Sequence, residues 1–151
     1  MALDDDIRTL SGVSLFGSFT QDQLRLLAFG AENMRVAAGK DLYQEGESAD
    51  GACVVVNGTV GLFHERESGR VQVGRAEAGS LLGEFALIAE TAHLTGAAAL
   101  TDLELLKINR RLFRRILEEY PETAAALHRR MVENFKKMVA EIERVGTRFR
   151  D

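Results

Sequence analysis

The spacing of glycine constrains the fold of this chain more than any other feature. From about Met34 to Ile108 glycines recur every several residues, and the apolar runs between them are too short to form helices. This pattern is typical of many short β-strands joined by turns. We expect strands near Val36 and over residues 41–43, 53–56, 60–63, 71–73, 97–100 and 103–108.

Two turns in this zone carry hairpin signals. Asn57-Gly58 lies between the β-prone runs 53–56 and 60–63, and both residue types tolerate a positive φ. We therefore predict a β-hairpin there. A second hairpin is predicted around residues 65–69, where charged residues mark an exposed tip between 62–63 and 71–73.

Helical patterns flank the β zone on both sides. Before it, residues 4–10 and the stretch after Thr20 predict two short helices, the second beginning with a capping hydroxyl and an early acid, Asp22. After Asn109 the apolar positions 112, 113, 116 and 117 share one face. The helix should end at Tyr120, because the residue before a proline avoids the α region, and Pro121 should begin another helix.

The last helix carries an apolar seam with alternating spacings of four and three. Its members are Met131, Phe135, Met138, Ile142, Val145 and Phe149. A seam of this kind pairs helices, so we predict a homodimer through this helix. Packing onto its own β zone is the alternative. A helix of roughly 28 residues spans ~42 Å, however, and so part of it should project.

Composition excludes several classes of function. A chain of 151 residues with 46% hydrophobic residues suits one soluble domain, and a net charge of −4 gives no footprint for nucleic acid. Cys53 is the only cysteine, so no disulfide framework is expected. With no signal-peptide pattern or long apolar segment, we expect a cytoplasmic protein without membrane contact.

Enzyme signatures are absent from the sequence. The three histidines, His64, His93 and His128, are scattered over a hairpin, a loop and a helix, which argues against a metal site. Neither a Gly-x-Ser-x-Gly elbow nor a Walker loop is present. The basic pairs at 110–111, 114–115 and 129–130 have acidic neighbours, which favours a solvated helix face over a nucleic-acid surface. We predict that the chain is not an enzyme.

Three stretches in a fixed order resemble one family. Residues 36–50 (VAAGKDLYQEGESAD), 54–60 (VVVNGTV) and 79–88 (GSLLGEFALI) are similar to the opening strands and turn, the central hairpin and the phosphate-binding cassette of cyclic-nucleotide-binding domains. That family includes catabolite-activator-type transcription factors and protein kinase A regulatory subunits. The resemblance spans about residues 15–135. It implies a mostly β fold with flanking helices: a double-stranded β-helix, or jelly-roll-like β-roll, with N-terminal helices and two C-terminal helices.

The resemblance also divides the chain. Residues 1–121 would form the β-roll with its N-terminal helices and the first helix after the roll. Residues 122–151 would form the C-terminal dimerisation helix of the same domain.

The cassette has the chemistry of a phosphate site. Gly83 permits a conformation closed to other residues, after which residues 84–87 can form one helical turn whose free N–H groups face an anion. In the resembled family the residue matching Glu84 binds the ribose 2′-hydroxyl, and amides near Ala86 bind the cyclic phosphate. We predict the ligand-binding residues to be Gly83, Glu84, Phe85, Ala86, His93, Leu94 and Thr95.

One departure from the family concerns the phosphate. Nine residues after the glutamate the family usually has an arginine, whereas this chain has His93, and there is no arginine between Arg75 and Arg110. The affinity for a cyclic nucleotide should therefore be lower. His93 either caps an anion, in a pH-dependent way, or is an exposed loop residue in a domain with a lost or altered ligand. Gly96 stands where the family often has Thr or Ser.

Two functions follow from these observations. The first is a non-enzymatic regulatory module that binds a cyclic nucleotide (cAMP or cGMP) or a related small anion and passes occupancy to the helices after Asn109, with no other cofactor. The second is a degenerate domain that serves as a dimeric scaffold. The remaining residues up to Asp151 leave no room for a helix-turn-helix, so we expect no direct DNA binding by this chain. The chain is then either a sensor fragment or a stand-alone domain.

Overall fold

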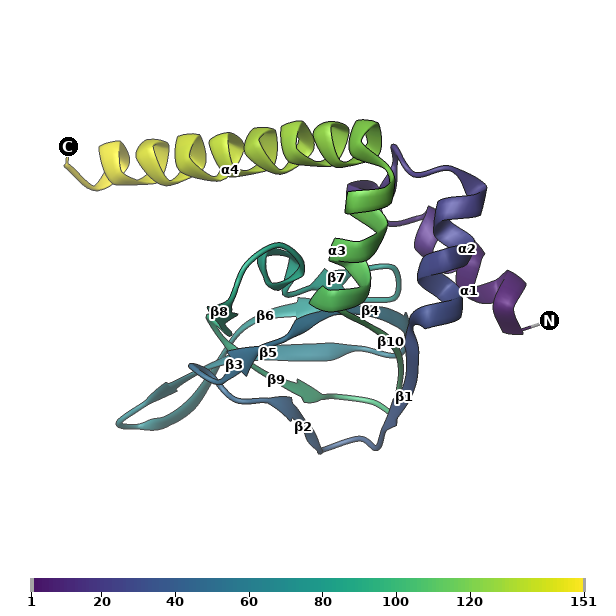
Figure 1. Cartoon of the computed structure of the whole chain (residues 1–151). Coiled ribbons are helices and arrows are strands. Elements are labelled where there is room, and N and C mark those ends of the chain that lie inside the picture. Colours follow the sequence, from purple (N-terminus) through teal and green to yellow (C-terminus); the bar gives the residue numbers. More distant parts are fainter. Residues whose placement is uncertain (1, 151) are drawn as a thin grey trace.

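The structure is a computed structural model that describes residues 2–150, with the side chains of residues 3–137, 139 and 140. Its N-terminal part contains α1 (Ala2–Ser11), the short 3₁₀ helix η1 (Ser14–Phe16) and α2 (Gln21–Gly30), which pack together beside the β-strands (Figure 1). The Thr20 hydroxyl accepts from the Gln23 amide and the Gln23 side chain accepts from the Thr20 amide, so α2 begins with a complete capping box.

The strands form two four-stranded antiparallel sheets and one small ladder. Their order is β1-β10-β4-β7 in the first sheet, β2-β9-β5-β6 in the second, and β3-β8 in the ladder. The strands are β1 (Glu32–Val36), β2 (Asp41–Tyr43), β3 (Ser48–Ala49), β4 (Gly51–Asn57), β5 (Val60–Arg66), β6 (Gly69–Ala76), β7 (Leu81–Leu82), β8 (Thr91–Ala92), β9 (Gly96–Ala99) and β10 (Leu103–Asn109). The predicted mostly β roll with flanking helices is confirmed.

The first sheet is buried on both faces. Val54 and Leu106 face the helices and join one apolar cluster, whereas Val55 and Leu105 face the second sheet and join another. Because side chains alternate across a strand, a strand covered on both sides needs an unbroken apolar run. This accounts for the run Cys53–Val56 and makes the first sheet the central layer of the molecule.

The hairpin predicted at Asn57-Gly58 is wrong. β4 pairs with β10 and β7, while β5 pairs with β9 and β6, so the chain crosses here from one sheet to the other. Gly58 has a φ of +99°, but Asn57 does not share a positive φ. The turn packs against the segment between β9 and β10, which also passes from one sheet to the other. There the Thr59 amide donates to Thr101 Oγ1 at 3.0 Å.

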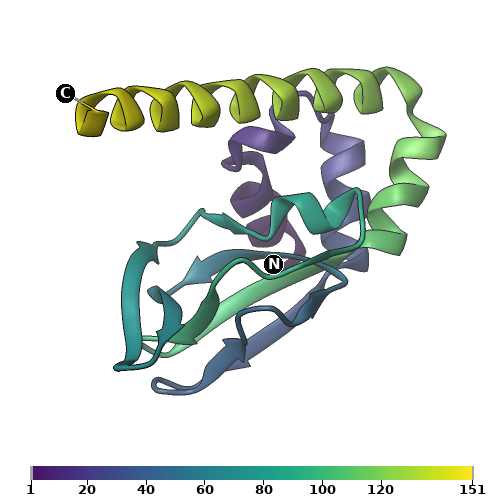
Figure 2. The same ribbon diagram turned by 90° about the vertical axis from the view of Figure 1, so that its left-hand side faces the viewer.

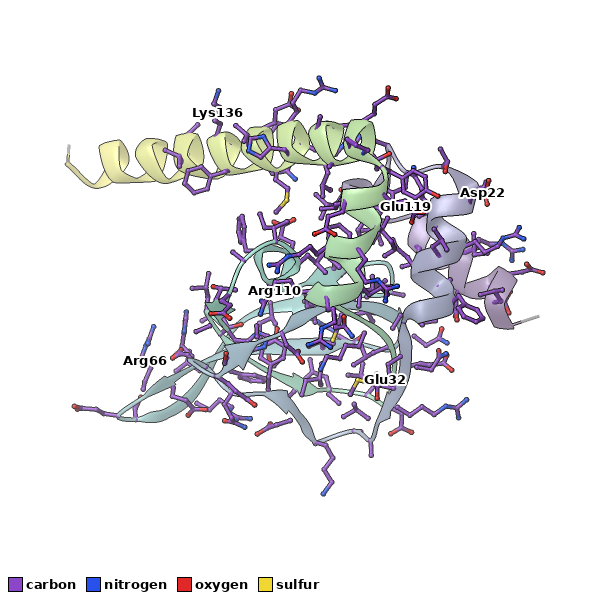
Figure 3. The ribbon with its side chains drawn as sticks, viewed as in Figure 1. Asp22, Glu32, Arg66, Arg110, Glu119 and Lys136 are labelled. Carbon is purple, nitrogen blue, oxygen red and sulfur yellow. The ribbon has the colours of Figure 1, made fainter. Side chains whose placement is uncertain are left out.

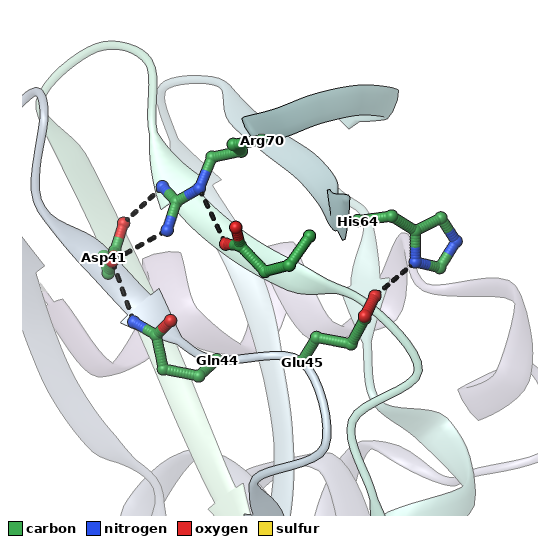
Figure 4. Close-up of polar contacts among 6 residues, drawn as sticks. Asp41, Gln44, Glu45, His64 and Arg70 are labelled. Atoms are coloured by element: carbon green, nitrogen blue, oxygen red, sulfur yellow. Dashed lines mark hydrogen bonds and ion pairs between the residues drawn. The ribbon is translucent and has the colours of Figure 1, made fainter. Parts of the chain in front are cut away.

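The second predicted hairpin is confirmed, because β5 and β6 pair from Val60↔Ala76 to Arg66↔Gly69. Polar contacts tie its outer half to β2 and to the segment that follows β2 (Figure 4). The Arg70 guanidinium donates to Asp41 at 2.9 Å and to Glu65 at 3.1 Å, and His64 contacts Glu45. Ion pairs at the protein surface add little to stability, because solvent screens them.

Two helices complete the fold. α3 (Arg110–Glu119) is capped by Asn109, whose side chain accepts from the Leu112 amide. α4 (Pro121–Arg150) begins at Pro121, as predicted. Figure 2 shows α4 running above the roll, with its later turns beyond the N-terminal helices. Within the described residues, no helix has the length and apolar character needed to cross a membrane.

The first turns of α4 pack against the rest of the chain, whereas the turn around Phe135 is exposed. Leu127 and Met131 are buried in the helix-side cluster, and the buried Thr123 hydroxyl donates to Gln23 at 3.2 Å. Phe135, one seam position further on, is 52% exposed. The other predicted seam residues, Met138, Ile142, Val145 and Phe149, lie outside the described side chains. The seam residue Met131 therefore packs within the chain, and the dimer stays a prediction.

Candidate ligand-binding cavity

A cavity of about 620 Å³ opens beside the helical turn η2 (Glu84–Leu87). Its volume lies within the range of small-molecule sites. The sequence-predicted residues all line it: Gly83, Glu84, Phe85, Ala86, His93, Leu94 and Thr95. The fold thus brings together two segments about ten residues apart. Their part in binding stays a prediction.

Gly83 sets the course of the chain into this cavity. Its φ of +80° and ψ of 37° lie in the left-handed region, as predicted, and η2 follows as a single 3₁₀ turn. A Cβ at this position would lie 3.4 Å from the Gly51 carbonyl oxygen, so β4 passes close behind. Both the conformation and this approach favour glycine.

The amides of η2 divide into free and bonded groups. The Ala86 amide donates to the Gly83 carbonyl at 3.0 Å, so it is not free as the sequence led us to expect. The amides of Glu84 and Phe85 precede the first bond of the turn and have no acceptor among the described residues. Among the amides of residues 84–86, those of Glu84 and Phe85 are therefore the ones available to an anion in this conformation.

The side chains of η2 separate into lining and core. Glu84 is half-buried in the cavity wall, and burial raises the pKa of its carboxyl group. Phe85 is 37% exposed at the cavity, whereas Leu87 is buried in the helix-side cluster. Among the other apolar residues of this region, Leu82 lines the cavity and is buried, while Leu94 is 81% exposed.

Two stacked rings form another part of the cavity wall, next to Gly83. Tyr43 and His93 lie with their ring centroids 3.5 Å apart and their planes 9° apart. The His93 amide donates to Glu47 O at 2.8 Å, and its carbonyl accepts from the Gly46 amide at 2.8 Å. His93 lies in a loop but is half-buried rather than exposed, so the exposure expected in the second interpretation is wrong, while the lost or altered ligand stays untested. Burial lowers the pKa of its imidazole.

The cavity wall contains few charges. Among its described lining residues none is lysine or arginine, and Glu84 is the one carboxylate. An anion would therefore depend on backbone amides, on hydroxyl groups such as that of Thr95, and on His93. Gly96 does not line the cavity, because a side chain there would point toward backbone atoms of Tyr43 and Glu45.

Several lining residues were missed from the sequence. Ser14 and Leu15 come from η1, Leu62 from β5 and Tyr43 from β2. Their contribution depends on how distant elements meet. An aromatic residue in the short run Asp41–Tyr43 was the one local signal for Tyr43.

Arg110 connects the cavity wall to α3. At the base of that helix (Figure 3), its Nη1 donates to three carbonyl oxygens: Ala49 at 3.2 Å, Ala86 at 3.1 Å and Ala89 at 2.9 Å. The last two belong to η2 and the residues just after it. Leu87 of η2 and Phe113 of α3 also share the helix-side cluster. Thus α3 contacts η2 through both a guanidinium and a packed core.

A smaller cavity of about 180 Å³ lies on the other side of the ring pair. Tyr43 and His93 line both cavities, and Cys53 and Lys107 line the smaller one. Within residues 2–150 as described, no group of three or more His, Cys, Asp or Glu side chains is placed to hold a metal ion.

Comparisons with known proteins match most of this chain, in sequence and in fold. The sequence model of the family described as "Cyclic nucleotide-binding domain" matches residues 33–120. A solved structure of a cyclic nucleotide-binding-like protein from Brucella abortus is 56% identical, with a TM-score of 0.72, covering 76% of this chain and 99% of that one. The N-terminal domain of a transcriptional regulator from Streptomyces coelicolor is 25% identical, with a TM-score of 0.81, covering 89% and 94%.

Curated relatives are much longer proteins. Lysophospholipase NTE1 of Pyricularia oryzae is 29% identical over 112 residues, which is 74% of this chain but 8% of that protein. Because the match covers so small a part of the relative, its lysophospholipase activity is not carried over to this chain.

Proposed function

Because this chain belongs to the family of cyclic nucleotide-binding domains, we propose that it is a non-enzymatic regulatory module that binds a cyclic nucleotide, cAMP or cGMP, in the cavity beside η2. One observation carries the proposal. The segments Gly83–Ala86 and His93–Thr95, which the family resemblance predicts, both line one open cavity of about 620 Å³.

Each wall contributes a different part of recognition. The free amides of Glu84 and Phe85 would donate to the cyclic phosphate, because the start of a helical turn presents unpaired N–H groups. The Glu84 carboxylate would accept from a ribose hydroxyl. The side chains of Phe85, Leu82 and Leu62 offer apolar surface to the rest of the ligand.

Occupancy would pass to the C-terminal helices through η2. Arg110 bonds to the carbonyl groups of Ala86 and Ala89, so a shift of η2 toward a bound phosphate would pull on the first residue of α3. The ligand must bind one arrangement of η2 and α3 better than another, since equal affinity for both would change nothing.

We also propose that α4 pairs with α4 of a second copy. The exposed apolar residues Val132 and Phe135 support this. A net charge of −4 gives no support for contact between this chain and DNA.

Thermal unfolding with and without nucleotide tests the proposal. A ligand that binds only the folded state raises the free energy of unfolding by about 2.7 kcal/mol at 100 times its Kd. We expect cyclic AMP or cyclic GMP to raise the midpoint temperature, and 5′-AMP, which lacks the cyclic phosphate, to do so less. If neither cyclic nucleotide at millimolar concentration shifts the midpoint, the domain is a scaffold without nucleotide binding.

A further inference from the structure

The contact between Tyr43 and His93 has an unusual geometry. Their centroid separation of 3.5 Å is about the thickness of an aromatic ring, and the planes are 9° from parallel, so the rings lie almost directly over each other. For two neutral rings this arrangement is unfavourable, because their quadrupoles repel, so in the free protein it must be imposed by the surrounding backbone. A cation above the face of a tyrosine ring is attracted instead.

We propose that Tyr43 and His93 together form the anion-recognition element of the cavity, in which a protonated His93, held against the Tyr43 ring, contacts the negative group of the ligand. The inference rests on the proposed function and names the residues that determine specificity at that site. Binding of the anion then takes up a proton, which a permanently charged arginine would not require.

The backbone fixes the imidazole in place. Hydrogen bonds from both peptide groups of His93 join it to Gly46 and Glu47, and the β3–β8 ladder continues this pairing through Ser48↔Ala92. His93 Cε1 lies 3.8 Å from where a Cβ on Gly83 would be. The ring is therefore held beside the first residue of the cassette, where an anion bound to the Glu84 and Phe85 amides would be within its reach.

The groups around His93 have opposite effects on its pKa. Burial and Lys107 of β10 lower its pKa, while Glu47 and Asp50 from the segment after β2 raise it, and the net direction is down. Glu47 accepts from the Gln44 amide at 2.8 Å and Asp50 pairs with Lys107 at 3.1 Å, so both carboxylates have other partners. Glu84 of η2 lines the same cavity, and burial raises the pKa of Tyr43 to about 12, which keeps its hydroxyl neutral.

The sign of the pH dependence follows from these directions. In the free protein His93 is mostly neutral at pH 7, because its pKa lies below its ordinary value. A bound anion favours the imidazolium and raises that pKa. Affinity should therefore increase as the pH falls, by at most about tenfold per pH unit for one linked proton.

Calorimetry with cyclic AMP tests proton uptake. We expect binding to be several-fold tighter at about pH 5.5 than at about pH 7.5, with proton uptake revealed by buffers of different ionisation enthalpy. H93Q should bind roughly tenfold more weakly at the lower pH and lose the pH dependence, while H93R should bind tightly at both pH values. H128Q, which removes an exposed histidine of α4, is the matched control and should resemble the wild type.

The role of Tyr43 is tested without any ligand. The chain has three histidines, so H93Q identifies the His93 signals in an NMR titration. We expect Y43L to lower the pKa of His93 and Y43F, which keeps the ring face, to leave it unchanged. If Y43L and Y43F give the wild-type titration, the ring pair is not a cation site and the inference fails, whatever cyclic AMP does.

The two failures are distinguishable. If cyclic AMP and cyclic GMP bind to no variant at any pH, the proposed function is wrong, and the NMR titration still decides whether Tyr43 supports a protonated His93. If cyclic AMP binds without proton uptake and H93Q binds as the wild type does, the proposed function stands and this inference is overturned.

Discussion

The two parts of the cavity wall would recognise a ligand by different means. On one side, Gly83 and η2 present backbone amides, and their geometry depends on a single left-handed residue. On the other side, recognition would depend on the contact between Tyr43 of β2 and His93 of the loop after β8. The backbone part of the family pattern is thus kept while the side-chain part has changed at His93, a change that we expect to act on affinity and pH response rather than on the fold.

The largest effect on this comparison is expected from Gly83→Ala. A left-handed conformation costs a residue with a Cβ roughly 1–2 kcal/mol, and relief of that strain would turn the Glu84 and Phe85 amides away from the cavity. We expect cyclic AMP affinity to fall by up to about a hundredfold, measured by calorimetry. Gly39→Ala is the control: Gly39 has a φ of +87° with no atom near a Cβ, and lies outside the cavity. Equal losses in both variants would contradict the role of η2.

A smaller effect is expected from Glu84→Gln. The amide keeps an oxygen that can accept from a ribose hydroxyl but loses the charge, so affinity should fall by about tenfold. Glu90→Gln, an exposed acid just after η2, should leave calorimetric affinity unchanged. An E84Q protein with wild-type affinity would remove the carboxylate from the proposed site.

The same variant tests the burial of Glu84 in the free protein. Burial raises the pKa of this carboxyl group, so the folded state opposes its ionisation, and the penalty is present only above the ordinary carboxyl pKa. E84Q should therefore unfold at a slightly higher temperature than the wild type near pH 7, and the difference should vanish below about pH 4. An E84Q protein that unfolds at a lower temperature than the wild type near pH 7 would mean instead that the folded state stabilises the carboxylate.

The smallest change in affinity is expected from Arg110→Gln. Its three carbonyl contacts lie behind η2 rather than in the cavity, so cyclic AMP affinity should change by no more than about threefold. The ligand's effect on amide hydrogen exchange in α3 should disappear, however. Arg111→Gln, the exposed neighbour, should keep that effect. A response of α3 that persists in R110Q would show that the packed Leu87–Phe113 core is sufficient for transmission.

The features of the fold and of the cavity that could be predicted from the sequence are those set by neighbouring residues. Gly83, η2 and the helix boundaries at Thr20, Asn109 and Pro121 follow from local chemistry, and the structure places them as predicted. Asn57-Gly58 predicted a reversal of the chain, but a turn motif does not say whether the next strand stays in the same sheet. The two-residue strands β3, β7 and β8 are too short to leave a periodic pattern.

Contacts between distant residues left no signal in the sequence. Tyr43 and His93 stack although 50 positions separate them, and nothing in either neighbourhood indicates a partner. The three carbonyl contacts of Arg110 could not be predicted either, because every residue has a backbone carbonyl group and the sequence does not show which of them lie near Arg110. The same holds for the Ala86 amide, whose bond to Gly83 depends on the 3₁₀ form of the turn.

Calorimetric titration of the wild type and G83A with cyclic AMP and cyclic GMP at about pH 6 tests the central claim most directly, because His93 is then available for protonation. The account predicts saturable heat from one cyclic nucleotide per chain in the wild type and much weaker binding in G83A. Absence of saturable heat from both nucleotides at millimolar concentration, or equal affinity in the two proteins, would contradict it.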